Sequence, residues 1–221
     1  MLQSETRQTA FFDLDRCLVL DDTIGGFSTR LVQRGLLPKR MLAEGALAYL
    51  LYRLNLADPA LLVARGVHYL RDLEESILYE AGQRFYDDVV RFRLRRSVLD
   101  ALERHQAEGH LVVLLTGGLP YVPRPLAEHL GFDACCSTIP EVADGRLTGR
   151  VIEPPCVGDG KIVHAHKAAT TIGGRLEDAW FYTDSYSDLP MLRLAQHPVV
   201  VNPDRKLARW AWRHKVEVLD G

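Results

Sequence analysis

The chain has 221 residues, of which 47% are hydrophobic and 25% are charged, values ordinary for a soluble globular protein. Its formal net charge of −2 gives no electrostatic reason to expect nucleic acid as a partner. Glu5 and Arg7 stand where a signal peptide would need an apolar run, and the longest apolar stretches are too short to span a bilayer. We therefore expect a cytoplasmic protein with no membrane partner.

The cysteines do not indicate a disulfide framework. Two of the four are adjacent and no CxxC spacing occurs; they are Cys17, Cys135, Cys136 and Cys156. A zinc site built from Cys156, His164 and His166 is an alternative that we set aside, because reduced thiols and helix-surface histidines explain the pattern more simply.

Short apolar runs that end in polar residues predict the strands of a buried sheet. In chain order these runs are Thr9–Asp13, Leu111–Thr116, Ala179–Asp184 and Pro198–Val201. Helical patterns follow several of them, most clearly at Pro123–Leu130 and Asp204–Arg213. Strands that alternate with helices predict an α/β fold with a doubly wound, mainly parallel, Rossmann-like sheet, whose reactive residues gather at the carboxyl ends of the strands.

The segment 22–96 contains no convincing strand and predicts an inserted, all-helical cap. Its helical patterns cover Leu36–Leu54, Pro59–Leu73 and Ser76–Arg95. Residues 1–21 and 97–221 then form the α/β core. Within the core, Asp144-Gly145 lies between the two strand-like arms of Cys135–Ile152, which predicts a β-hairpin.

Asp13 and Asp15 give the sharpest chemical signal. Two carboxylates at positions i and i+2 after a strand face the same pocket if the chain stays extended. Such close acids repel unless a cation lies between them or one is protonated. Both outcomes suit phosphoryl transfer, with Asp13 as nucleophile and Asp15 as general acid and base. The alternative is a pair of solvated loop acids.

Asp184 and Asp188 give the second signal. Asp184 ends a predicted strand and Asp188 follows one helical turn later. Carboxylate oxygens at strand ends are ligands that Mg²⁺ prefers. The alternative is a capped helix, with Ser185 or Ser187 at the N-cap and Asp188 favoured by the helix dipole.

Two further segments have the composition of phosphate-binding sites. Thr116-Gly117-Gly118 offers a hydroxyl and unobstructed backbone N–H groups at a strand end. Lys161 opens a helical pattern after Gly158-Asp159-Gly160, where an ammonium group can reach a phosphate. An ordinary strand-to-helix turn and a solvated lysine are the alternatives.

Together, the order DxD, strand-end Thr, Lys and DxxxD resembles the haloacid dehalogenase-like superfamily over nearly the whole chain. The residues that match its four motifs are Asp13 with Asp15, Thr116, Lys161, and Asp184 with Asp188. The strings DSYSDLPML and HPVVVNPD, and the hairpin carrying Leu147-Thr148-Gly149, are similar to the phosphoserine phosphatase-like branch. That branch, which includes phosphoserine and histidinol-phosphate phosphatases, has a helical cap at the position of the segment 22–96.

The resemblance implies a set of catalytic and metal-binding roles. Asp13 would be the nucleophile and a Mg²⁺ ligand. Asp15 would be the general acid and base and would bind Mg²⁺ through its backbone carbonyl. Asp184 would be the remaining carboxylate ligand, and Asp188 would support either the metal site or Lys161.

The resemblance also implies which groups hold the phosphate. Thr116 and the N–H of Gly117 would bind the phosphoryl group, and Lys161 would neutralise its charge. Cys17 departs from the family pattern, which usually has Thr or Ser two residues after the second Asp. A thiol donates a weaker hydrogen bond than a hydroxyl, so Cys17 puts the rate and the redox sensitivity in question. A catalytic Cys17 is not expected, because neighbouring carboxylates disfavour a thiolate.

The expected function is a Mg²⁺-dependent phosphatase that acts on a small phosphate monoester through an aspartyl-phosphate. Asp15 favours this reaction, because superfamily dehalogenases lack the second aspartate. Phosphotransfer to another alcohol, a catalytically weakened phosphate-binding protein and an interaction module built on the cap are the alternatives. The expected partner is a small phosphorylated metabolite, and the expected state is a monomer or homodimer.

Substrate choice is assigned to the cap. Asp21 or Asp22 could bind an amino group, as in an amino-alcohol or amino-acid phosphate such as phosphoserine or histidinol phosphate. Arg53 or Arg65 could contact the substrate from farther away. N-capping of a helix by Asp22 is the competing interpretation. The basic run 91–96 is interpreted as a solvated helix face, and Gly25-Gly26 and the region near residue 96 are predicted as hinges for cap closure.

Overall fold

A computed structural model describes residues 7–53, 56 and 58–219 of the chain, and the side chains of residues 52 and 53 lie outside that description. Its main sheet has the strand order β3-β2-β1-β6-β7-β8 and every neighbouring pair is parallel. The predicted parallel α/β sheet is confirmed. The strands are β1 (Thr9–Phe12), β2 (Leu111–Leu115), β3 (Ala134–Cys136), β6 (Trp180–Thr183), β7 (His197–Val201) and β8 (Glu217–Leu219).

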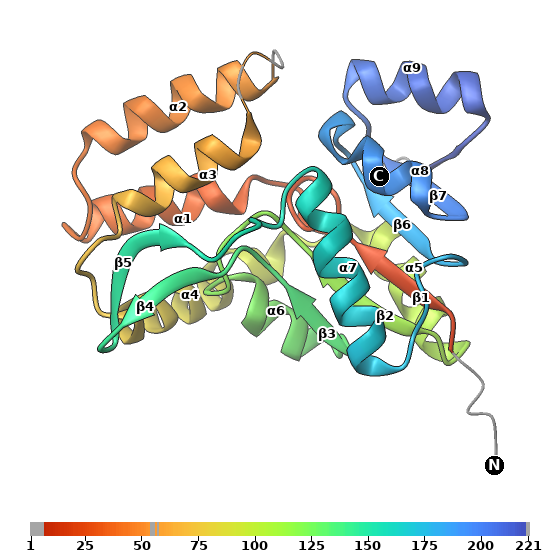
Figure 1. Cartoon of the computed structure of the whole chain (residues 1–221), viewed down its shortest axis with the longest axis horizontal. Helices are drawn as coiled ribbons and strands as arrows, with labels where there is room; N and C mark the ends of the chain where they lie inside the picture. The colour runs from red at the N-terminus through yellow and green to blue at the C-terminus, as the bar shows by residue number, and fades with distance from the viewer. Residues whose placement is uncertain (1–6, 54–55, 57, 220–221) are drawn as a thin grey trace.

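Helices cover both faces of this sheet, which explains why its central strands are apolar on both sides. Phe12 and Leu114 face a cluster that includes α5 and α6, and Phe11 and Leu115 face a cluster that includes α7, α8 and α9. In Figure 1, α7 crosses in front of the sheet. The helices are α5 (Arg96–Ala107), α6 (Pro123–Leu130), α7 (Asp159–Ile172), α8 (Leu189–Leu194) and α9 (Arg205–His214).

Strand β1 occupies a central position between β2 and β6. Asp13, Thr116 and Asp184 each follow one of these three adjacent strands directly. Because parallel strands end at the same edge of a sheet, this topology brings the three residues together from distant parts of the sequence.

Within the described part of the chain, four α-helices lie between β1 and α5, in the segment predicted to be the cap. They are α1 (Thr23–Gln33), α2 (Arg40–Arg53), α3 (Pro59–His68) and α4 (Glu75–Asp88). Figure 1 shows them gathered at one end of the molecule. The pattern predicted for Ser76–Arg95 was too long, because α4 ends at Asp88 and a short 3₁₀ helix, Val90–Phe92, follows. Gly25 and Gly26 lie inside α1, and their role as hinges stays a prediction.

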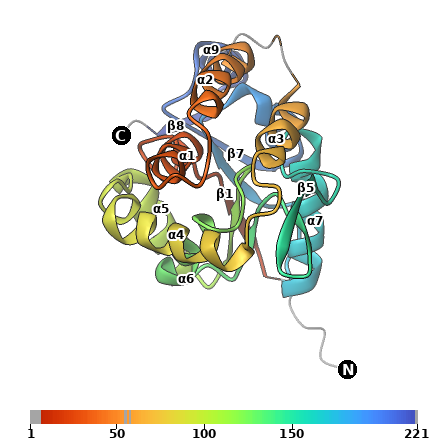
Figure 2. The ribbon, with the colours of Figure 1, turned by 90° about the vertical axis from the view of Figure 1, so that its left-hand side faces the viewer.

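The predicted hairpin is confirmed, with shorter arms than its sequence pattern indicated. It consists of β4 (Pro140–Ala143) and β5 (Arg146–Val151), whereas Cys135 and Cys136 belong to β3 of the main sheet. The hairpin packs on the cap: Leu147 joins a buried cluster with residues of α1 and α4, and β5 lies next to α3 (Figure 2).

The backbone joins the hairpin to the cap as well. Leu147 exchanges hydrogen bonds with the turn between α3 and α4, from its N–H to the carbonyl of Leu73 and from the N–H of Asp72 to its own carbonyl.

No helix in the described part of the chain is long and apolar enough to cross a membrane.

Candidate active site

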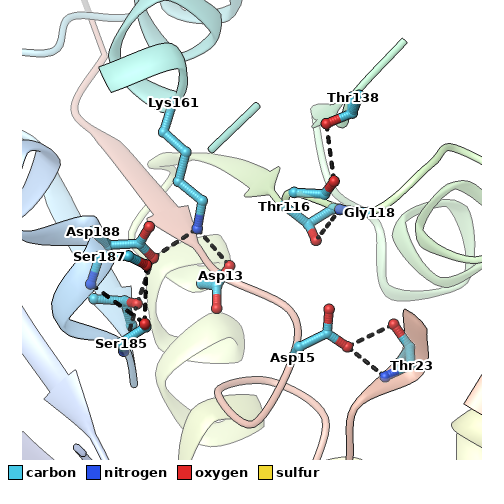
Figure 3. Close-up of polar contacts among 12 residues, drawn as sticks. Asp13, Asp15, Thr23, Thr116, Gly118, Thr138, Lys161, Ser185, Ser187 and Asp188 are labelled. Atoms are coloured by element: carbon cyan, nitrogen blue, oxygen red, sulfur yellow. Dashed lines mark hydrogen bonds and ion pairs between the residues drawn. The ribbon is translucent and has the colours of Figure 1, made fainter. Parts of the chain in front are cut away.

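A buried ion-pair network lies at the carboxyl edge of the central strands. The Lys161 Nζ atom lies 2.6 Å from Oδ1 of Asp13 and 2.7 Å from Oδ2 of Asp188. The hydroxyl of Thr183 donates to the same Asp188 oxygen at 2.7 Å. Figure 3 shows Asp13 and Asp188 converging on the lysine. The predicted first, third and fourth motifs therefore meet in one place.

Lys161 reaches this network from the first turn of α7, and Gly160 makes the approach possible. A Cβ atom on Gly160 would lie 2.0 Å from the backbone oxygen of Pro155, so a side chain cannot be accommodated there. Although burial lowers the pKa of Lys161, the charges of Asp13 and Asp188 raise it well above its ordinary value. Lys161 is therefore a fixed cation.

Asp184 is the carboxylate that the lysine does not neutralise. Its residue is 6% exposed, and no hydrogen bond or ion pair reaches its side chain from the described residues. Burial, and then the charges of Asp13 and Asp188, raise the pKa of Asp184 to about 8. Burial also raises the pKa of Asp13 to about 6, against the opposing effect of Lys161.

This charge distribution fits a divalent cation. Of the three buried aspartates, Asp13 and Asp188 share one lysine and Asp184 is unpaired among the described residues, and unpaired buried carboxylates are costly unless a cation or a proton compensates them. Carboxylate and carbonyl oxygens are the donors that Mg²⁺ prefers. The side chains of Asp13 and Asp184 suit such an ion by their chemistry.

Asp15 faces the cap side of the site. Its Oδ1 accepts hydrogen bonds from both the backbone N–H and the hydroxyl of Thr23, each at 2.6 Å (Figure 3). Burial, and then the charge of Asp22, raise the pKa of Asp15 to about 7, while the Thr23 bonds oppose the shift. Thr23, the first residue of α1, was missed at the sequence level, because a lone threonine after two aspartates carries no distinctive signal.

Thr116 and the two glycines after it form a tight turn at the end of β2. The N–H of Gly118 donates to the Thr116 hydroxyl at 3.2 Å, and the Thr138 hydroxyl donates to the carbonyl of Gly117 at 2.9 Å. A Cβ on Gly117 would come within 2.6 Å of the Val157 side chain. The turn is thereby held against the segment that leads into α7.

Arg95 anchors the loop that carries both motif-one aspartates. Its guanidinium donates to the carbonyls of Cys17 and Arg16, each at 3.0 Å, and the residue is 4% exposed. The interpretation of 91–96 as a solvated helix face was wrong for Arg95, which is buried beyond the end of α4. The sequence of segment 91–96 gives no indication of which of its arginines turns inward.

Cys17 lies fully buried in the same loop. Burial, and then the charges of Asp13 and Asp184, raise the pKa of its thiol well above the ordinary value. This direction agrees with the expectation that Cys17 is a poor thiolate. Its place in the main apolar cluster explains how the fold accommodates the thiol in this loop.

The acidic residues considered for substrate binding have structural partners. Asp22 is the N-cap of α1 and accepts from the N–H of Gly25 at 3.1 Å, which confirms the capping interpretation. Asp21 forms an ion pair with Arg93 at 2.6 Å. Arg65 lies in α3 and pairs with Glu44, and the side chain of Arg53 lies outside the described residues.

A pair of histidines near the start of β2 is joined by a hydrogen bond. His105, Glu108 and His110 bring potential metal ligands together, but the Nδ1 atoms of the two histidines lie 2.8 Å apart and bond each other. His164, one residue of the zinc alternative that we set aside, forms a hydrogen bond between its ring and the Pro154 carbonyl.

The sequence is similar to named phosphatases. A protein named probable phosphatase in Mycobacterium tuberculosis (H37Rv) is 31% identical over 93% of this chain and 72% of its own length. A phosphoserine phosphatase from the same organism is 28% identical over 96% of this chain and 70% of its own length. A histidinol-phosphatase of Neisseria meningitidis is 26% identical over 93% of this chain and 95% of its own.

Solved structures and a family model agree with these similarities. A protein of unknown function from Bordetella pertussis has a TM-score of 0.86 at 27% identity and covers 97% of this chain and 99% of its own. A phosphoserine phosphatase with a phospho-aspartyl intermediate analogue shares the fold, with a TM-score of 0.71 at 20% identity over 97% and 93% of the two chains. The model of the haloacid dehalogenase-like hydrolases matches residues 10–193. The chain belongs to the haloacid dehalogenase-like hydrolase family.

Proposed function

We propose that the protein is a Mg²⁺-dependent phosphatase that hydrolyses a small phosphate monoester through an aspartyl-phosphate on Asp13. The observation that carries this proposal is the buried contact between Asp13 and Lys161 beside the unpaired carboxylate of Asp184. One lysine leaves this cluster negatively charged. A metal ion and a phosphate ester would together complete its charge balance.

The residues have the chemistry that the two half-reactions need. In the first, an Asp13 oxygen bonds to phosphorus, the ester P–O bond breaks, and protonated Asp15 gives its proton to the leaving alkoxide. In the second, deprotonated Asp15 takes a proton from water as the water oxygen attacks phosphorus and releases Asp13. A pKa of about 7 for Asp15 suits a group that must act first as acid and then as base.

The remaining residues would hold the phosphoryl group in line. We assign the hydroxyl of Thr116, the N–H of Gly117 and the ammonium of Lys161 to its oxygens. Asp13, Asp184 and the backbone carbonyl of Asp15 would hold Mg²⁺, whose charge offsets the charge that develops during transfer. Asp188 would keep Lys161 in position through their 2.7 Å contact.

The substrate class follows from the relatives and stays a proposal for this chain. Proteins similar to it are named phosphoserine phosphatase and histidinol-phosphatase. Both names describe phosphate esters of small amino alcohols or amino acids. We propose such a metabolite as the substrate of a cytoplasmic monomer or homodimer.

Phosphate release tests this function directly. Wild-type protein should release phosphate from p-nitrophenyl phosphate, phosphoserine or histidinol phosphate in the presence of Mg²⁺. Phosphate release should stop when a chelator removes the metal. Asp13→Asn should lower kcat by at least about 1000-fold, because the amide cannot act as the nucleophile. Asp100→Asn is the matched control, since Asp100 is a half-exposed aspartate on α5. Equal turnover by wild type and Asp13→Asn would reject the assignment.

A further inference from the structure

Arg16 occupies a backbone conformation that its side chain does not favour. It lies between Asp15 and Cys17 with φ of +61°, in the left-handed region that glycine and asparagine adopt more readily. The loop holds it there from both sides: its N–H donates to the Asp21 carbonyl at 3.3 Å, and its own carbonyl accepts from Arg95. Strain of this kind gathers at functional sites.

The guanidinium of Arg16 lies between the catalytic edge and the cap. Its Cζ atom lies 5.0 Å from the centre of the Tyr49 ring, on α2. In the chain it directly follows Asp15, whose carboxylate accepts the two hydrogen bonds from Thr23 at the cap side of the site. Arg16 therefore bridges the reaction centre and the cap helix.

The guanidinium has donors that the protein does not use. No ion pair or hydrogen bond to an acceptor reaches the Arg16 side chain within the described ranges 7–53, 56 and 58–219, and the residue is half-buried. A planar guanidinium presents five N–H donors in a geometry that matches a carboxylate, and it stacks on aromatic faces. The Tyr49 contact satisfies the stacking and leaves the donor edge for an anion.

We infer that Arg16 is a specificity-determining residue that binds a carboxylate on the alcohol part of the phosphate ester. This inference rests on the proposed phosphatase function. Asp15 protonates the leaving alkoxide from the cap side, where Thr23 holds it, and Arg16 is its neighbour in the chain. The leaving group thus departs toward the side of the site that the arginine borders.

The inference separates the two substrate types that the relatives' names describe. Phosphoserine carries a carboxylate, whereas histidinol phosphate does not. The acids first considered for amine binding are already engaged, Asp22 as a helix cap and Asp21 with Arg93. The structure therefore favours recognition of a negative group over recognition of an amine, and phosphoserine-type esters over histidinol phosphate.

Matched pairs of esters test this role. We compare kcat/KM for phosphoserine with phosphoethanolamine, which lacks only the carboxylate, and for 3-phosphoglycerate with glycerol 3-phosphate. Wild type should prefer the carboxylate-bearing member of at least one pair. Arg16→Gln should reduce that preference about 10- to 100-fold, mainly through KM, because a charge-assisted bidentate contact is lost. Arg16→Lys should keep part of it, and Arg34→Gln, an exposed cap control, should keep all of it.

Stability measurements exclude a purely structural role. Arg16→Asn suits the left-handed backbone, so its Tm should equal or exceed that of wild type even though the carboxylate preference falls. An unchanged substrate ratio in Arg16→Gln, or a wild type with no preference, would overturn the inference and leave the phosphatase standing. Absence of turnover with every ester would overturn both.

Discussion

At the scale of single residues, the site is defined by an excess of negative charge. Lys161 contacts Asp13 and Asp188, and Asp184 is left without a cation of its own among the described residues. A buried carboxylate is stabilised in its charged form only where a positive charge lies close to it. Protonation and metal binding therefore compete for the same place, and stability becomes sensitive to both pH and Mg²⁺.

Asp184 provides the first test of this competition. Its pKa is raised from 3.8 to about 8, so the folded state binds a proton that the unfolded state has released. The stability from this group is present at low pH and is lost as the pH rises toward about 8. Metal-free Asp184→Asn should therefore be more stable than wild type at high pH, by roughly 1–3 kcal/mol.

Thermal unfolding with and without Mg²⁺ measures this effect. Mg²⁺ should raise the Tm of wild type at high pH and should leave Asp184→Asn nearly unchanged, because ligand-linked stabilisation requires the site. A metal-free Asp184→Asn protein that is less stable than wild type at high pH would show that no such repulsion exists.

Asp15 provides a second residue-scale test through its role as general acid. With a pKa of about 7, it should lose its proton as the pH rises through neutrality, so kcat/KM for an alkyl phosphate should fall on the alkaline side. Asp15→Asn should slow the alkyl ester by roughly 100- to 10,000-fold. It should slow formation of the phospho-enzyme from p-nitrophenyl phosphate far less, because nitrophenolate leaves without a proton. Stopped-flow bursts that fall equally for the two esters would contradict this role.

At the scale of elements, a short paired segment holds the loop after β1, in addition to the two hydrogen bonds that Asp15 accepts from Thr23 of α1. The N–H of Leu20 donates to the carbonyl of Arg93, and the N–H of Arg95 donates to the carbonyl of Leu18. The Arg95 side chain adds two more bonds to this loop. The chain that leaves the cap thus fixes the position of the motif-one aspartates.

Replacement of Arg95 should show this anchoring. Arg95→Gln removes a buried charged donor from two carbonyls and should destabilise the protein by about 2–4 kcal/mol, with a loss of kcat from the disordered loop. Arg96→Gln is the matched control, because Arg96 is exposed and bonds only surface acids within the described chain. Urea unfolding measures both, and an equal, small effect of the two changes would argue against the anchor.

Helix α4 depends on a close backbone approach at Gly82. A Cβ there would lie 2.0 Å from the backbone oxygen of Tyr121, in the loop that continues from the Thr116 turn. Gly82→Ala should therefore destabilise the protein by about 2–4 kcal/mol through forced separation of α4 from that loop. Gly45→Ala on α2 meets nothing within 4 Å and should stabilise by roughly 0.5–1 kcal/mol. Thermal unfolding of both variants measures whether stability falls in Gly82→Ala and rises in Gly45→Ala.

At the scale of the whole molecule, the hairpin and the cap form a common packing unit above the catalytic edge. Leu147 packs among residues of α1 and α4, and Arg71 in the turn after α3 donates to the Thr148 carbonyl at 3.1 Å. The hairpin belongs to the core in sequence and to the cap in its contacts. The cap boundaries at residues 22 and 96, and closure of the cap over substrate, stay predictions.

Much of this architecture could be predicted from local signals, and the rest depends on tertiary contacts. The apolar runs before Asp13, Thr116 and Asp184 identified the strands because a doubly covered sheet requires them. The burial of Arg95 depends on a partner segment almost eighty positions away, which no local pattern records. Strands β3 and β8 are three residues long, too short for a periodicity to be recognised.

The covalent role of Asp13 is tested most directly by trapping. Wild-type protein is mixed with Mg²⁺ and p-nitrophenyl phosphate, quenched in acid within the first turnover, digested and mapped by mass spectrometry. We predict a phosphoryl group on Asp13 itself, within the peptide that contains this residue. It should form at the rate of nitrophenol release and should be absent in Asp13→Asn. Turnover without any phosphorylated Asp13, or with the phosphoryl group on another residue, would contradict the account.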